Sequence, residues 1–189
     1  MSRLKLLCTA AAGGAITLVV AASVATPSAS QSQPAGASNA MVERGRYLVS
    51  ITGCHDCHSP KTTGMTPDMS RALSGRPATT PVPSATKNEV HASLDLTAWT
   101  GPWGQSVASN LTPDPTTGIG NRYTEASFIQ TMRTGKKPNG TPVQPPMPAE
   151  VYQNMADDDL RAIWAYLRTV KPVRNPVLAG LTAPAPAPK

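Results

Sequence analysis

The pentapeptide Cys54-His55-Asp56-Cys57-His58 restricts what this chain can fold around more than any other feature of the sequence. The spacing C-x-x-C-H is typical of covalent haem attachment. Two thiols at this spacing can form thioethers with the two vinyl groups of one porphyrin. The next residue, His58, then lies under the ring, where its imidazole can bind the iron. The motif therefore predicts a domain built around one covalently attached haem c, held by Cys54 and Cys57 and ligated by His58.

Two other uses of the cysteine pair, a structural zinc site and a thiol redox site, have less support. The third cysteine, Cys8, lies in an N-terminal apolar stretch, and the sequence contains neither a second C-x-x-C nor an H-x₃₋₅-H pair to complete a zinc site. A thioredoxin-like pair needs a preceding strand within a βαβ pattern, and no strand-like run precedes Cys54. His55 occupies a variable position of the motif, and we expect it to face solvent rather than to bind iron.

The N-terminus has the pattern of an export signal. Arg3 and Lys5 form a short basic region, and residues 6–25 are apolar or small without a charge. Small residues at 23–25 suit a signal peptidase, so we expect residues 1–25 to be a cleaved signal peptide and the mature protein to be periplasmic. The alternative is a retained anchor facing the periplasm, because about 20 apolar residues can span a bilayer. Membrane association is expected only in that case.

The rest of the chain divides by composition. Residues 26–40 are rich in Ser, Ala, Pro, Gln and Gly and predict a flexible linker. Residues 41–175 are expected to form one folded domain, and residues 176–189 an Ala- and Pro-rich tail. The chain has 20 prolines and a single phenylalanine, so large apolar side chains are scarce. A buried haem would supply the missing apolar mass, and we expect stability to depend on it.

Three segments predict helices. In residues 41–52, Gly45 removes a side chain from one face and allows another helix to approach closely. Residues 125–134 follow Thr124, a good N-cap, and end at a glycine. The strongest signal is in residues 157–170, where apolar residues recur at i, i+3, i+4 and i+7.

Residues 59–109 predict a long irregular loop. They are rich in Pro, Thr, Ser and Gly and show no sustained period, apart from one possible helical turn at Arg71 to Leu73. Loops of this length are often functional. Trp99 and Trp103 are its large aromatic residues, and Trp103 is presented by a Gly-Pro-Trp-Gly turn. Packing of this indole against the haem and pinning of the loop to the body are equally supported.

A haem iron bound by one histidine has a sixth position to fill, and a sulfur ligand there gives a low-spin electron carrier with a raised potential. Met147 is favoured, because prolines at 145, 146 and 148 stiffen its loop and a weak thioether–iron bond needs a held side chain. Met132 fits the apolar face of a helix better, and His91 in the irregular loop is the main rival. The remaining candidates are Met65, Met69 and Met155.

The chain resembles bacterial class I single-haem cytochromes c, particularly the cytochrome c proteins and subunits that accompany periplasmic dehydrogenases. The resemblance covers most of residues 41–175. It is carried by Glu43-Arg44-Gly45-Arg46-Tyr47-Leu48, the haem motif, Gly101-Pro102-Trp103-Gly104, Asn110-Leu111-Thr112-Pro113-Asp114, Thr117-Gly118-Ile119-Gly120, Met132-Arg133-Thr134-Gly135, Pro146-Met147-Pro148 and Asp159-Leu160…Ala165-Tyr166-Leu167-Arg168.

This resemblance implies a mainly α, cytochrome c-like helical domain around one covalently bound haem, with the first and last helices crossing beside it. It also implies His58 and Met147 as the axial ligands. Two residues depart from the family pattern. Ala149 stands where an aromatic residue is frequent, and Ala156 stands where a Ser or Thr cap usually precedes the acidic turn of the last helix.

These features favour a one-electron carrier that is not an enzyme and that serves a dehydrogenase, an oxidase or another cytochrome. A haem peroxidase and a gas sensor are the alternatives. Both need an open iron site, and a peroxidase also needs a distal base, for which His91 is the remaining candidate. The formal net charge of +6 comes without a block of Lys and Arg residues, so nucleic-acid binding has little support.

Four polar residues are candidates for the surroundings of the haem. Arg133 and Asn110 can each hydrogen-bond a propionate, and a solvated surface charge is an equal alternative for Arg133. Lys136 and Lys137 come shortly before Met147 in the sequence. We expect these two lysines to lie near the haem edge and to steer an acidic partner.

Overall fold

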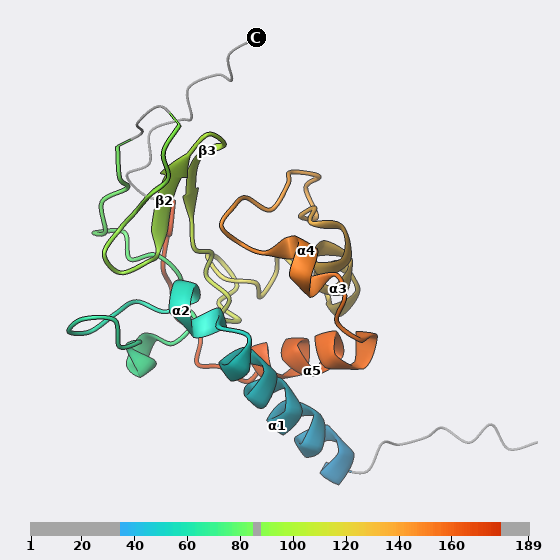
Figure 1. The fold of residues 1–189 in the computed structure, drawn as a ribbon. Helices are drawn as coiled ribbons and strands as arrows, with labels where there is room; N and C mark the ends of the chain where they lie inside the picture. Colours follow the sequence, from blue (N-terminus) through green and yellow to red (C-terminus); the bar gives the residue numbers. More distant parts are fainter. Residues whose placement is uncertain (1–34, 85–87, 179–189) are drawn as a thin grey trace, which may run out of the picture. The chain divides into compact units, whose positions relative to one another are not determined.

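The computed structural model describes residues 35–84 and 88–178. The predicted signal peptide, most of the predicted linker and most of the predicted tail lie outside the described residues. Within the described ranges, helices and a small antiparallel sheet surround one hydrophobic core (Figure 1). No helix in this part of the chain is both long and apolar enough to cross a membrane.

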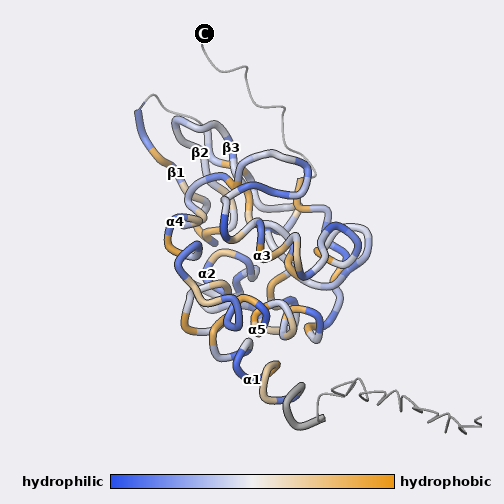
Figure 2. The backbone as a smooth tube through the Cα atoms, turned by 90° about the vertical axis from the view of Figure 1, so that its right-hand side faces the viewer, coloured by the Kyte–Doolittle hydropathy of each residue, from blue (hydrophilic) through white to orange (hydrophobic). Residues whose placement is uncertain are grey.

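Helices α1 (Ala35–Ile51) and α5 (Asp157–Leu167) cross at Gly45, as its missing side chain predicted. A Cβ atom on Gly45 would lie 1.9 Å from the carbonyl oxygen of Ala162, so the two backbones approach to a distance that a larger residue would prevent. Figure 2 shows hydrophobic residues interleaved with hydrophilic ones along both helices. The buried core residues come mainly from these helices and from the segments packed on them: Leu48, Val49, Leu73, Ile119, Phe128, Ala162, Ile163, Trp164 and Leu167.

The ends of both helices differ from the sequence-based prediction. Helix α1 begins at Ala35, so residues 35–40, predicted as linker, are helical. Alanines in this stretch favour a helix even though the sequence there has no apolar period. Helix α5 ends at Leu167 rather than at residue 170, because β-branched residues and a proline follow and do not extend a helix well.

Helix α3 (Glu125–Thr134) has the predicted bounds and caps. The Thr124 hydroxyl accepts from the backbone N–H of Ser127, and the Ser127 hydroxyl interacts in return with the N–H of Thr124. Gly135 ends the helix in the left-handed region at φ 64°. The ring of Phe128 packs on Trp164 of α5 with centroids 5.5 Å apart. The short helix α4 (Ala149–Tyr152) follows the loop that carries Met147, here called the Met147 loop.

The segment predicted as an irregular loop contains a three-stranded antiparallel sheet, which corrects that part of the prediction. The strands are β1 (His91–Ala92), β2 (Ala98–Gly101) and β3 (Gly104–Val107), in the order β1-β2-β3. Strands of two to four residues are too short to show a period of two in the sequence. The expected helical turn is present as the 3₁₀ helix η1 (Met69–Arg71), two residues earlier than predicted. The sheet lies at the end of the domain away from the α1–α5 crossing (Figure 1).

The chain after α5 returns along the domain and is held by polar side chains. Asn175 donates to the carbonyls of Ser74 and Arg76 at 2.7 and 2.8 Å. The Arg76 side chain in turn donates to the carbonyl of Val177 at 2.8 Å, and Val177 is buried. The first residues of the predicted tail are therefore part of the folded domain, which extends beyond residue 175.

Candidate haem-binding site

The C-x-x-C-H motif forms its own short helix, α2 (Cys54–His58), directly after α1. Gly53 makes the turn between the two helices in the left-handed region at φ 72°. Residues three apart on a helix share a face, so Cys54 and Cys57 lie on the same side of α2. This arrangement presents both thiols to one ligand.

Neither motif cysteine has the environment of a reactive thiol in a redox pair. Burial raises the pKa of Cys54 and also that of Cys57. Reactive and redox cysteines instead have a lowered pKa, so that the thiolate is present at neutral pH. The environment is therefore unfavourable for a thiol redox pair.

The imidazole of His58 has a fixed orientation. Its Nδ1 lies 2.8 Å from the carbonyl oxygen of Ser109, and because a carbonyl can only accept, Nδ1 carries the proton. The lone pair is then on Nε2, which is the atom free to bind a metal. Burial lowers the pKa of His58, which keeps the ring neutral, as an iron ligand must be. The donor set on α2 thus fits haem c, with two thiols for the ring and one oriented imidazole for the iron.

Lys61, which the sequence did not single out, caps the C-terminal end of α2. Its ammonium donates to the carbonyls of Asp56 and Ser59, each at 2.7 Å, and to that of His55 at 3.3 Å. The carbonyl of His58 accepts from the backbone N–H of Gly75 at 2.7 Å. A cation at a helix C-terminus is favourable for the helix dipole. These contacts stabilise the C-terminal end of the short motif helix.

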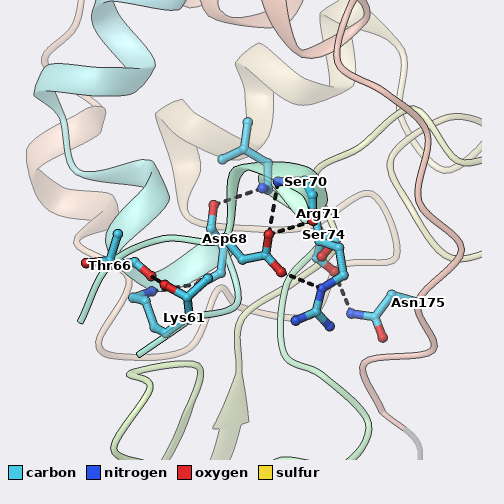
Figure 3. A network of polar contacts seen from close by, with 10 residues as sticks. Lys61, Thr66, Asp68, Ser70, Arg71, Ser74 and Asn175 are labelled. Atoms are coloured by element: carbon cyan, nitrogen blue, oxygen red, sulfur yellow. Dashed lines mark hydrogen bonds and ion pairs between the residues drawn. The ribbon is translucent and has the colours of Figure 1, made fainter. Parts of the chain in front are cut away.

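The loop after α2 is closed by further polar contacts (Figure 3). Asp68 accepts from the Ser70 backbone N–H at 3.0 Å and from Arg71 Nε at 2.9 Å, which shapes η1. Asn175 reaches Ser74 from the C-terminal segment. The loop that follows the motif helix is therefore tied to the chain after α5.

Met147 lies in the loop between α3 and α4 and is partly buried. The backbone N–H of Val143 donates to Gly135 at 2.7 Å, and that of Ala149 donates to Met147 at 2.9 Å. The hydroxyl of Tyr152 on α4 donates to the carbonyl of Thr52 at 2.8 Å, two residues before Cys54. Burial raises the pKa of Tyr152 to about 12, so this donor keeps its proton. The element that follows Met147 is thus joined to the start of the haem motif.

The two predicted ligand segments are also joined through a third segment. Ser109 accepts from His58, and Ser106, three residues earlier, donates its hydroxyl to the carbonyl of Pro145 at 2.5 Å. Three residues span at most about 10 Å. The structure therefore brings the His58 segment and the Met147 loop onto the same short stretch of chain.

The rival ligands have other environments. Met65 and Met69 are exposed, whereas Met132 and Met155 pack against the hydrophobic core. His91 lies on β1 with its Nε2 at 3.0 Å from a carboxylate oxygen of Glu89.

The structure places three polar residues in surroundings that the sequence did not predict. His55 is half-buried with Nδ1 at 2.9 Å from the Ser59 hydroxyl, so it does not simply face solvent. Asn110 is fully buried, and its amide hydrogen-bonds Thr117, Val173 and Thr112, so it is a structural residue rather than a propionate donor. Arg133 pairs with Asp157 at 2.5 Å and with the carbonyl of Gln153, and it joins α3 to the start of α5.

Comparison with known proteins decides the family. The family model described as Cytochrome c matches residues 42–171. The chain belongs to the cytochrome c family. Proteins of this family carry covalently bound haem c and transfer electrons through it, and this chain does so too.

The curated relatives are larger dehydrogenase-associated proteins. The alcohol dehydrogenase (quinone) cytochrome c subunit of Gluconobacter oxydans is 32% identical over 72% of this chain and 23% of its own length. The fructose dehydrogenase cytochrome subunit of Gluconobacter japonicus is 30% identical over 76% of this chain and 24% of its own length. The gluconate 2-dehydrogenase cytochrome c subunit of Pantoea cypripedii is 33% identical over 72% and 25%. The chain thus spans about a quarter of the length of these relatives.

Proposed function

We propose that this protein is a periplasmic one-electron carrier in which Cys54 and Cys57 hold a single haem c and His58 and Met147 are the axial ligands. Bound haem supplies the one-electron couple between ferric and ferrous iron. The protein contributes the attachment, the orientation of the imidazole and the loop that presents the sulfur. In this proposal no residue acts as a catalyst.

The observation that carries the proposal is the hydrogen bond from His58 Nδ1 to the carbonyl of Ser109, 2.8 Å long. It fixes the tautomer in which Nε2 binds iron, on a helix that also presents two thiols at the spacing of a haem. The bond also makes the imidazole more electron-rich, which strengthens its binding to the metal.

Met147 as the sixth ligand is supported by the placement of its rivals. Two of the other candidate methionines pack against the core and two are exposed, while His91, on the edge strand β1, contacts Glu89. The Met147 loop instead is tied to the same segment as His58. A soft sulfur ligand favours the ferrous state and leaves no open position for peroxide or a gas, so it supports a carrier over a peroxidase or a sensor.

A dehydrogenase is the electron donor that the comparisons favour. The relatives are cytochrome subunits of alcohol, fructose and gluconate dehydrogenases. We propose that this chain accepts electrons from such an enzyme and passes them on to an oxidase or another cytochrome.

The test is to express the full chain with export and haem maturation and to measure three properties of the product. Intact mass and a haem stain on a denaturing gel should show one covalent haem, and Cys54→Ala or Cys57→Ala should reduce its yield. Redox titration should fit a single one-electron step. Ferrous protein should be unreactive toward carbon monoxide. Complete loss of haem in acid–acetone, or rapid carbon monoxide binding, would contradict the proposal.

A further inference from the structure

A chain of two hydrogen bonds runs from the β2–β3 turn to the Met147 loop. The indole Nε1 of Trp103 donates to the hydroxyl of Ser106 at 3.1 Å, and that hydroxyl donates to the carbonyl of Pro145 at 2.5 Å. Pro145 is two residues before Met147. The single proton of the Ser106 hydroxyl is therefore directed at the loop, because the indole fills the acceptor side of the oxygen.

The donor end of this chain is rigidly placed. Trp103 occupies the tight turn between β2 and β3, and a Cβ atom on Gly101 would lie 2.6 Å from the Trp103 ring, so the ring packs directly over Gly101. Ser106 is paired with the buried Trp99 across the sheet. A hydroxyl on a paired strand has little freedom to move, which suits a residue that holds a loop in place.

The other end of the same stretch holds His58. Ser109 lies two residues after the end of β3, and its carbonyl accepts from His58 Nδ1. Ser106 and Ser109 therefore contact the two proposed ligand segments from positions no more than about 10 Å apart. The small sheet within the long loop is therefore linked to both proposed ligand segments. The stretch that includes β3 connects the His58 segment with the Met147 loop.

We propose that Ser106, oriented by Trp103, is a positioning residue that holds the Met147 loop against the iron. This rests on Met147 being the sixth ligand, as proposed above. A thioether–iron bond is weak, so its strength depends on how far the loop can move away. Loss of one hydrogen bond of ordinary net strength changes the balance between attached and detached Met147 about fivefold.

The experiment measures how readily added imidazole displaces the sixth ligand in the ferric protein. Ser106→Ala should raise the apparent imidazole affinity about fivefold. It should also lower the temperature at which the weak far-red absorption band of the sulfur–iron bond disappears. Trp103→Phe keeps an aromatic ring but removes the indole N–H donor, and it should shift both readouts in the same direction by a smaller amount. Ser106→Thr restores the hydroxyl and should return both to the parent values.

Thr100→Val is the matched control. Thr100 lies on the neighbouring strand, and its hydroxyl donates to the carbonyl of another proline, Pro83, at 2.6 Å, but that loop carries no proposed ligand. This variant should lower the global unfolding midpoint and leave imidazole affinity unchanged. If Ser106→Ala and Thr100→Val behave alike, Ser106 has only a structural role.

Met147→Ala separates this inference from the proposed function. If Met147→Ala binds imidazole no better than the parent, Met147 is not the ligand and the proposed ligation is wrong. If Met147→Ala binds imidazole tightly while Ser106→Ala matches the parent, the ligation stands and the positioning role of Ser106 is overturned.

Discussion

Replacing Gly45 with alanine should destabilise the protein strongly, because this residue is where α1 and α5 cross. An added Cβ would lie 1.9 Å from the carbonyl oxygen of Ala162 and 2.8 Å from the Cβ of Tyr166. Both contacts involve the partner helix near its backbone, so no flexible side chain can move aside. To bring the first contact from 1.9 Å to 3.0 Å, the helices must separate by about 1.1 Å or more.

The magnitude follows from what the separation costs. A gap of 0.5–1 Å removes roughly a quarter to a half of the dispersion energy of the atoms that face it, and the buried side chains at this crossing include Val49 and Ile163. Alanine regains about 1 kcal/mol in helix propensity over glycine. With this offset, we expect Gly45→Ala to lower the free energy of unfolding by about 2–4 kcal/mol, which corresponds to a fall in Tm of roughly 10 °C.

Thermal unfolding of the haem-loaded protein, followed by far-UV circular dichroism, measures this directly. Ser50→Ala is the control, because Ser50 is exposed on the same helix and the change should stay within about 0.5 kcal/mol. A Gly45→Ala protein as stable as the parent, with the Ser50→Ala value as reference, would mean that α1 and α5 do not approach as described.

Three further predictions concern residues around the site and on the surface. Lys61→Met removes the ammonium that caps α2, so it should lower the free energy of unfolding by about 1–3 kcal/mol and reduce the yield of covalent haem. It should also lower the reduction potential, because a positive charge near the motif favours ferrous iron. An unchanged potential and yield would limit Lys61 to a surface role. Hydrogen bonds from the side chain and backbone of Thr117 hold the pKa of Asp114 at about 2. The ionised carboxylate therefore stabilises the fold above the ordinary pKa of 3.8, and this stabilisation is lost as pH falls toward 2. Urea unfolding across that range should show that the free energy of unfolding of Asp114→Asn depends less on pH than that of the parent. An identical pH dependence would contradict this role of Asp114. The double change Lys136→Gln, Lys137→Gln should flatten the salt dependence of electron transfer to an acidic partner without changing the haem spectrum, and an unaltered dependence would leave these lysines without a docking role.

The long helices could be predicted from the sequence because each carries a local signal. The apolar period of α5, the Thr124 cap of α3 and the small residue at Gly45 in α1 all belong to short stretches that determine their own structure. The start of α1 was missed because nothing in residues 35–40 marks a buried face. The sheet was missed because hydrogen-bonded pairing between the strands defines it, while the short strands show no alternating sequence period.

The candidate site divides in the same way. Cys54, Cys57 and His58 form a local motif, and the proline frame around Met147 is visible in the sequence. The residues that orient these side chains cannot be recognised in the sequence, because their contacts are long-range. The contact from Ser106 to Pro145 spans 39 positions, and that from His58 to Ser109 spans 51. Serine is common on protein surfaces, so no composition or spacing distinguishes these two. Lys61 is close to the haem motif in the sequence, but a single lysine near a helix end does not predict a cap unless the carbonyls that it contacts are known.

The far-red absorption of the ferric protein tests the central claim most directly, because a sulfur–iron bond gives a weak band there that other ligands do not give. The parent protein should show the band, and Met147→Ala should lose it and become reactive toward carbon monoxide when reduced. Met132→Ala and Met155→Ala remove methionines that pack against the core, and they should keep the band while losing stability. A Met147→Ala protein that retains the band would contradict the claim that Met147 is the sixth ligand of the iron.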